Sequence, residues 1–347
     1  KQDIEMALDM LGRSDSAVQG KTTRSQPDAV DDAVVIDLPP TILQYYGKVE
    51  LAIDVMHVNR IPFLTSISKK IHYGTVSALH NMKIPTMEEC IDKILRAYGI
   101  RGFHVTAIHV DIQFKSIKDR GNLNLITNVV SRGEHVPDIE RHHRVLKERA
   151  RCYCAMLLKV DINTLPRMMV IHLMTTVNFY VNAFVWRRGV SQVLPPVTIV
   201  EGLVVDFNKH FHVIFGEYMH TYEGTDNTMK MRTVAALALG PSGNLQGGVR
   251  CYSLRTGKVL HRFMKDITLM KMPHDVLGRL KYITRKEKSV KGLIFGDRYN
   301  NDITDDVITG VLVPNAATTD NDDHVNAPYE LIDDESAIEA DDTEGLE

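Results

Sequence analysis

The order of apolar segments between residues 49 and 111 is the feature that most restricts the folds open to this chain. Three strand-like runs follow one another with short breaks, at residues 49–58, 61–68 and 70–79. A helical stretch at 87–99, with Thr86 as its expected cap, precedes a fourth strand-like run at 103–111. Three neighbouring strands predict an antiparallel meander, so the order is βββαβ. This order predicts an α/β fold.

The segments after residue 111 predict a second helix and then a different kind of unit. Residues 123–127 are a candidate short strand, and Pro137 stands where a first-turn proline begins a long helix that reaches Leu158. An apolar helix is expected over 165–186, followed by an extended, proline-rich connection at 193–202. From 211 to 272, short alternating runs separated by Gly/Asn turns predict a small all-β module of about five strands.

Charge is distributed unevenly along the 347 residues. Residues 301–347 hold 15 of the 44 acids and no Lys or Arg, which leaves residues 1–300 with 41 cations against 29 acids, a formal charge of +12. A basic body fits a polyanionic partner such as a phosphate backbone, and the acidic tail is expected to be disordered. With the segment pattern above, this divides the chain into a lead-in segment (1–47), an α/β core (48–190), a connector (191–210), a β-module (211–280) and a basic, then acidic linker or tail (281–347).

Cysteine usage and hydropathy bear on the compartment. The four cysteines are irregularly spaced, which indicates a reducing environment and no disulfide framework. No secretory signal is visible. The most apolar stretch, 168–186, contains too many polar residues for a membrane span, so we expect no membrane partner.

Three carboxylates in separate segments are the candidate catalytic residues. Asp54 and Asp111 lie on strand-like runs, and Glu140 lies in the first turns of the second long helix. Three acids brought together repel, since two unit charges about 4 Å apart cost about 4 kcal/mol at an effective dielectric near 20. A divalent cation removes this cost. Hard oxygen ligands suit Mg²⁺ or Mn²⁺, and two such ions support an in-line phosphoryl transfer.

The helix that bears Glu140 also carries a basic stripe. With about 100° of rotation per residue, Glu140, Arg144, Lys147 and Arg151 fall within an arc of about 60°. An adjacent apolar stripe, of Val136, Ile139, Leu146, Ala150, Tyr153 and Leu157, is expected to pack on the sheet. The three cations are therefore candidate contacts for nucleic-acid phosphates.

Simpler interpretations exist for several of these residues. Glu134 and Asp138 compete with Glu140, and an acid at this position also favours a helix N-terminus. We interpret His109, His135, His142 and His143 as solvated or packed side chains. The pairs Phe211/His212 and Tyr218/His220 are interpreted as strand alternation in the β-module, and not as a platform for stacking.

Several blocks of the sequence resemble the integrase region of LTR-retrotransposon polyproteins, Copia-like and related elements. They are ELAIDVMHVNRIPFLTSI, HVDIQF, EHVPDIERHHRVLKERAR, GVSQVLPPVTIVEG, the segment HFHVIFGEYMHTYEGTDNTMKMRTVAALALGPSGNLQGG and SLRTGKVLHR, within about residues 48–280. The resemblance implies a ribonuclease-H-like mixed sheet flanked by helices, followed by an SH3-like β-module. It places Asp54, Asp111 and Glu140 in the D,D,E positions, as ligands of Mg²⁺ or Mn²⁺.

The function implied is that of a metal-dependent polynucleotidyl transferase, which processes DNA 3′ ends and joins them to target DNA. The implied partners are DNA, flanking polyprotein domains and a second copy of the chain, in the nucleus or in a cytoplasmic particle. The step of 29 residues from Asp111 to Glu140 is shorter than usual in this family. Three alternatives therefore stay open: a catalytically inactive nucleic-acid-binding remnant, a nuclease of the same fold, and an interaction module that does not bind DNA.

Overall fold

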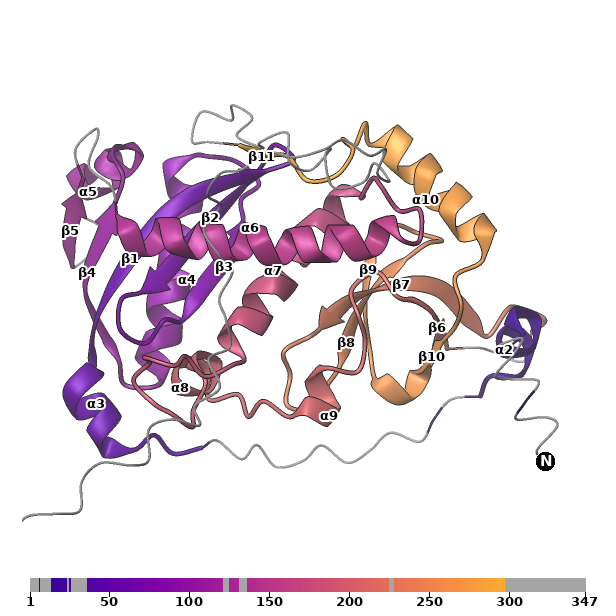
Figure 1. Cartoon of the computed structure of the whole chain (residues 1–347), viewed down its shortest axis with the longest axis horizontal. Coiled ribbons are helices and arrows are strands. Elements are labelled where there is room, and N and C mark those ends of the chain that lie inside the picture. The colour runs from indigo at the N-terminus through magenta and orange to yellow at the C-terminus, as the bar shows by residue number, and fades with distance from the viewer. Residues whose placement is uncertain are drawn as a thin grey trace, which may run out of the picture. The chain divides into compact units, whose positions relative to one another are not determined.

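The computed structural model describes residues 6, 14–23, 25, 36–120, 125–130, 136–224 and 228–296 (Figure 1). Contacts gather Lys1–Thr304 into one unit, and a second unit, Asp305–Glu347, falls outside the described residues together with the predicted disordered tail. Glu134 and His135 also fall outside them.

The first sheet has the strand order β3-β2-β1-β4-β5. The long strand β1 (Lys48–Val58) pairs antiparallel with β2 (Ile61–Ser68), which pairs antiparallel with β3 (Gly74–Ala78). On the other side, β4 (His104–Val110) runs parallel to β1, and β5 (Ile126–Val129) runs parallel to β4. The predicted βββαβ order is confirmed, and the short segment that follows it supplies the fifth strand.

The alternation of side chains along β1 directs its residues to two different helical layers. Leu51, Ile53 and Val55 pack in a cluster with residues of α4 (Ile84–Ile100). Ala52 packs on the opposite face, in a cluster with Ile139 of α6 (Pro137–Leu158). Helices thus cover both faces of the sheet, and α6 crosses it in Figure 1.

The second sheet is antiparallel throughout, with the order β10-β6-β7-β8-β9. Its strands are β6 (Tyr218–Tyr222), β7 (Thr233–Pro241), β8 (Val249–Ser253), β9 (Val259–Arg262) and β10 (Ile267–Leu269). The β-module of five strands is therefore confirmed. Tyr218 and His220 alternate within β6 as predicted, and the hydroxyl of Tyr218 lies 2.9 Å from Nε2 of His220.

Helices α6 and α7 connect the two sheets. In α7 (Arg167–Asn182), Leu173 and Val177 share a buried cluster with Leu237 and Leu239 of β7. The hydroxyl of Thr176 donates to the carbonyl of Leu239 at 2.6 Å. The 22-residue helix α6 begins at Pro137 and buries its apolar stripe as predicted. Near its far end, Tyr153 contacts Phe215, with ring centroids 6.0 Å apart.

The remaining elements are short or lie near the ends of the described chain. They are α2 (Asp15–Lys21), α3 (Pro40–Tyr46), α5 (Lys115–Arg120), α8 (Pro196–Glu201), α9 (Phe207–His210), α10 (His274–Lys286), β11 (Phe295–Gly296), and the 3-10 turns η1 (Ile112–Phe114) and η2 (Met264–Asp266). No described helix combines the length and the apolarity that a membrane span requires. The four cysteines are all free thiols.

Several local expectations differ from the structure. The connection at 193–202 contains the buried helix α8, which Gly202 ends with a positive φ of 75°. Thr86 is not a cap, since α4 begins at Ile84 and the Thr86 hydroxyl donates to Asn81 Oδ1. Residues 281–286, expected in a linker, belong to α10, and β11 pairs with β1. Phe211 and His212 precede β6 and form no strand.

Candidate active site

The register of β1 and β4 brings two of the predicted acids side by side. Ile53 pairs with Val110, the last residue of β4, so Asp54 and Asp111 are the residues that follow this pair, and paired strands lie about 4.8 Å apart in a sheet. Because side chains alternate along strands, Asp54 shares the face of Ala52, on which α6 packs. Asp111 lies beside it at the end of β4. The sequence prediction that these two acids meet at the edge of the sheet is consistent with this register.

The Asp54 carboxylate is held by two donors on one oxygen. The amide of Val55 donates to Oδ1 at 2.7 Å, and Nε2 of Gln113 donates to the same atom at 3.1 Å. The side chain keeps 27% of its surface exposed. These two hydrogen bonds fix the orientation of the carboxylate.

Asp111 shapes the turn that carries Gln113. Its Oδ1 accepts from the amide of Ile112 at 2.7 Å and caps the 3-10 turn η1. This cap ends β4 and folds the chain back, so that Gln113 reaches Asp54. The residues that follow the second acid are thus part of the site.

His143 connects α6 to the same carboxylate. Its Nε2 lies 2.6 Å from the hydroxyl of Thr65, which itself donates to the carbonyl of Asp54 at 2.9 Å. Burial lowers the pKa of His143 to about 3, with His142 and Lys147 adding to the effect, so the ring is neutral. Its Nδ1 lies 4.0 Å from Asp54 Oδ2.

Glu140 lies three residues before His143, on the adjacent turn of α6. It is exposed, and its neighbour Ile139 is buried against Ala52. The first turn of α6 is thereby placed over the part of the sheet that holds Asp54. Asp138 shares this turn and is partly buried.

The carboxylates of Asp54 and Asp111 are hard donors of the kind that Mg²⁺ and Mn²⁺ prefer. In the part of the chain that the structure describes, however, no three His, Cys, Asp or Glu side chains are gathered closely enough to hold a metal ion. The chemistry of Asp54 and Asp111 thus fits the predicted metals. The third predicted ligand, Glu140, does not complete a three-ligand set with them among the described residues.

The basic stripe of α6 divides into exposed and engaged cations. Arg144 and Arg151 are exposed, as phosphate contacts require. Lys147 is partly buried, and its Nζ lies 5.5 Å from the centre of the Phe295 ring of β11. The two arginines are therefore the more accessible cations of the stripe.

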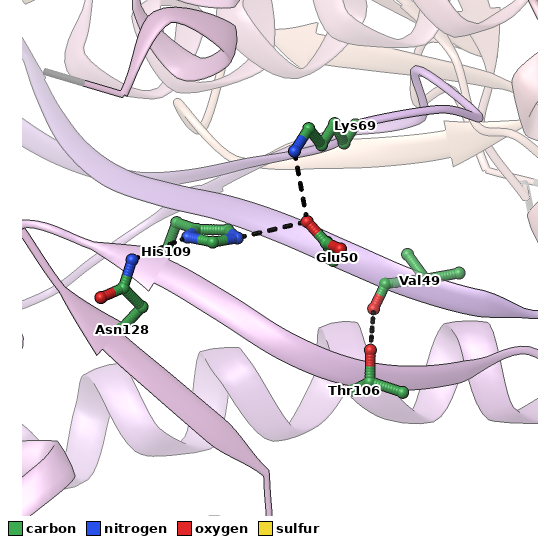
Figure 2. A network of polar contacts seen from close by, with 6 residues as sticks. All are labelled: Val49, Glu50, Lys69, Thr106, His109 and Asn128. Carbon is green, nitrogen blue, oxygen red and sulfur yellow. Dashed lines mark hydrogen bonds and ion pairs between the residues drawn. The ribbon is translucent and has the colours of Figure 1, made fainter.

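A polar network crosses the sheet on the same face, farther from the acids (Figure 2). Glu50 of β1 accepts from His109 of β4 and from Lys69, both at 3.4 Å, and Asn128 of β5 lies 3.1 Å from the other ring nitrogen of His109. The hydrogen bond from His109, followed by that from Lys69, lowers the pKa of Glu50. The network joins the three strands β1, β4 and β5.

Sequence reasoning missed Gln113, Thr65 and the role of His143. His143 is packed, as predicted, but it packs against Asp54. The available signals were spacing: Gln113 follows the second acid by two residues, and His143 follows Glu140 by nearly one helical turn. Thr65 carries no such signal, because only the pairing of Asp54 with Thr65 across β1 and β2 places it here.

Strand order, strand direction and the helices on both faces define an α/β protein with a ribonuclease-H-like mixed sheet, followed by an antiparallel five-stranded module. Among solved structures, the chain is similar to the catalytic core domain of BIV integrase. The TM-score is 0.32 and the identity 18%, over 44% of this chain and 92% of that domain. No protein-family model and no curated protein matches the sequence. The fold assignment depends on the strand order and register alone.

Proposed function

We propose that the chain is an integrase-type polynucleotidyl transferase, with Asp54, Asp111 and Glu140 as its acids and DNA as its substrate. The observation that supports this proposal is the pairing of Ile53 with Val110, since these are the residues just before the first two acids, and Ala52 of the same strand packs on Ile139 in the first turn of α6. The resemblance of the sequence blocks to retrotransposon integrases supports it further. A Copia-like origin, action as a homo-oligomer within a polyprotein, and a nuclear or particle-associated location belong to the same proposal.

In this proposal each residue of the site has a separate role. Bound Mg²⁺ or Mn²⁺ supplies activation of the attacking oxygen and stabilisation of charge on the leaving oxygen. Gln113 and the Val55 amide hold the Asp54 carboxylate in place. His143, kept neutral by burial, adds no positive charge that would compete with a cation beside Asp54. Arg144 and Arg151 hold the phosphate backbone.

The test compares Asp111→Asn and Glu140→Gln with Asp138→Asn, which alters the competing acid in the same helical turn. Removing an electrostatic group at a reacting phosphate lowers the rate by about 100-fold or more. We expect both former variants to lose strand transfer to this extent and Asp138→Asn to retain it. Calorimetry should show weaker Mg²⁺ binding by Asp111→Asn and Glu140→Gln than by the parent. Full strand transfer by Asp111→Asn would overturn the proposal.

The second candidate is a nucleic-acid-binding remnant without catalysis. It is favoured by the absence of a three-ligand set among the described residues and by the short step from Asp111 to Glu140. It predicts salt-sensitive DNA binding with no metal-dependent turnover. A nuclease of this fold would instead cleave a DNA end without joining it. An interaction module would bind no DNA at moderate salt, so one set of assays separates the four functions.

A further inference from the structure

A column of aromatic rings runs from α6 to the surface at α9. Tyr153 stacks on Tyr180, with centroids 6.5 Å apart and planes at 16°. Tyr180 stacks on Phe211 at 5.2 Å and 23°, and Phe211 stacks on Phe207 at 5.4 Å and 14°. Phe184 lies beside Phe211 at 5.6 Å. Three of these steps are nearly parallel, as in a stack of nucleobases.

The outer end of this column is open to solvent. Phe207 is 73% exposed and Phe184 is 60% exposed, whereas Tyr153, Tyr180 and Phe211 are partly buried. Phe184 and Phe207 both adjoin Phe211, so their exposed rings form one continuous apolar patch and are not isolated surface residues. The column thus ends in a flat face against which a further planar group can stack.

The segment that carries Phe207 and Phe211 is held in place by a helix cap and by a contact with the β-module. Asp206 caps α9 by accepting from the amide of Asn208 at 2.8 Å. His210 is buried, and its Nε2 lies 3.0 Å from the carbonyl of Asn244 in the β-module. The rings are therefore ordered before any ligand arrives, which lowers the entropic cost of binding.

Cationic side chains follow the rings in sequence. Arg187 and Arg188, both exposed, come three and four residues after Phe184, and Lys209 lies between Phe207 and Phe211. The acid closest in sequence, Asp206, is engaged in the helix cap. Exposed rings with flanking cations are the combination by which proteins bind single-stranded nucleic acids.

We infer that Phe184, Phe207 and Phe211 form a stacking site for unpaired bases of a nucleic-acid strand, whose phosphates Arg187 and Arg188 contact. An apolar protein surface is the competing occupant. The nearly parallel geometry of the column favours a base, which continues the stack on Phe207. This site is separate from the acids, and its function does not depend on strand transfer.

The experiment measures binding of a labelled single-stranded oligonucleotide to the whole chain by fluorescence anisotropy, with EDTA present so that the outcome is independent of metal-dependent catalysis. Four variants are compared with the parent: Phe207→Ala, Phe207→Leu, Phe207→Trp and, as a matched control, Tyr45→Ala, which removes an aromatic side chain that is 69% exposed on α3. Duplex DNA serves as the second ligand.

Stacking on an aromatic ring contributes about 1–3 kcal/mol per base, so Phe207→Ala and Phe207→Leu should each weaken single-strand binding by about fivefold or more. Phe207→Trp and Tyr45→Ala should retain it, and duplex binding should change little. In a Trp186→Phe background, the single tryptophan of Phe207→Trp should be quenched by the oligonucleotide. If Phe207→Leu binds the single strand as tightly as the parent does, the inference is wrong and the surface is a protein-docking surface instead. Equal losses for single strand and duplex would overturn it too.

Discussion

Gly74, at the start of β3, is a residue whose surroundings leave no room for a side chain. Its amide donates to Oδ1 of Asn182 at 2.9 Å. Its carbonyl accepts from Asn182 at 2.7 Å and from Asn178 at 2.9 Å, both on α7. The buried ring of His142 from α6 fills the space where a Cβ would lie. One glycine thus fastens β3 to two helices.

Gly74→Ala should therefore destabilise the fold. The new methyl would lie 2.6 Å from Nε2 of His142, inside van der Waals contact, and overpacking of this kind costs about 1–3 kcal/mol. Gly99→Ala is the matched control, since a Cβ there meets nothing within 4 Å and lies in α4, where alanine is favoured by about 0.5–1 kcal/mol. Urea unfolding should show opposite shifts for the two variants. Equal shifts would mean that the ring of His142 moves aside at no cost.

At this scale the sequence predicted those site residues that belong to regular patterns. Asp54 and Asp111 were predicted because the first lies within an apolar run and the second at the end of one, and the residues just before them, Ile53 and Val110, are paired in the sheet. Gln113 and Thr65 could not be found, because their roles depend on a turn geometry and on a cross-strand register that no local pattern encodes.

Among the elements, α6 presents cations in two directions, and this makes its binding role testable. Arg144 and Arg151 lie on the stripe of Glu140, whereas Arg149 lies about 180° around the helix and is also exposed. Each phosphate contact that is lost lowers the slope of log affinity against log salt concentration by about 0.9 on duplex DNA.

Arg144→Gln and Arg151→Gln should each flatten the salt dependence of DNA binding by about this amount, and Arg149→Gln should leave it unchanged. Anisotropy titrations between low and physiological salt would measure the three slopes. If Arg149→Gln flattens the slope as much as the others, the stripe is not the contact surface and the effect is one of net charge.

Elements with a clear period were predicted well, and those that depend on tertiary contacts were not. The helix α6 and the strands of both sheets follow their hydrophobic patterns. Pro195 and Pro196 suggested an extended chain, yet Pro195 is the N-cap of α8 and Pro196 is its first residue, where the missing N–H costs no helical hydrogen bond. Burial of Val197 and Ile199 stabilises this helix. The basic residues of α10 suggested a linker, although Val276 and Leu280 bury its apolar side.

On the scale of the whole molecule, the two sheets are joined through α7, and this junction carries a titratable group. Burial lowers the pKa of His172 to about 4, and the positive charges of Arg250 and His261 add to this effect. The guanidinium of Arg250, from β8, donates to the hydroxyls of Thr175 and Thr176 at 3.4 and 3.2 Å. A second cation at this junction is therefore unfavourable.

The stability of the fold should depend on pH through this histidine. An unfolded histidine titrates near pH 6.5, so between pH 6.5 and about 4 the unfolded state binds the additional proton. The contribution of His172 is present above pH 6.5 and is lost as the pH falls toward 4. His172→Gln should flatten the decline in free energy of unfolding between pH 7 and 5, and His104→Gln, at an exposed position, should not. If the free energy of unfolding depends on pH in the same way in the parent and in His172→Gln, His172 does not cause the decline.

The helix that bears Glu140 at one end is seated against the β-module at the other, where Leu157 packs against Gly216 and leaves no space for a side chain there. A helix of 22 residues is about 33 Å long and bends little over that distance. Because the helix is stiff, a displacement of the β-module at Leu157 is transmitted to the end that bears Glu140. A ligand that moves the second sheet would therefore also move the Glu140 carboxylate, without contacting it.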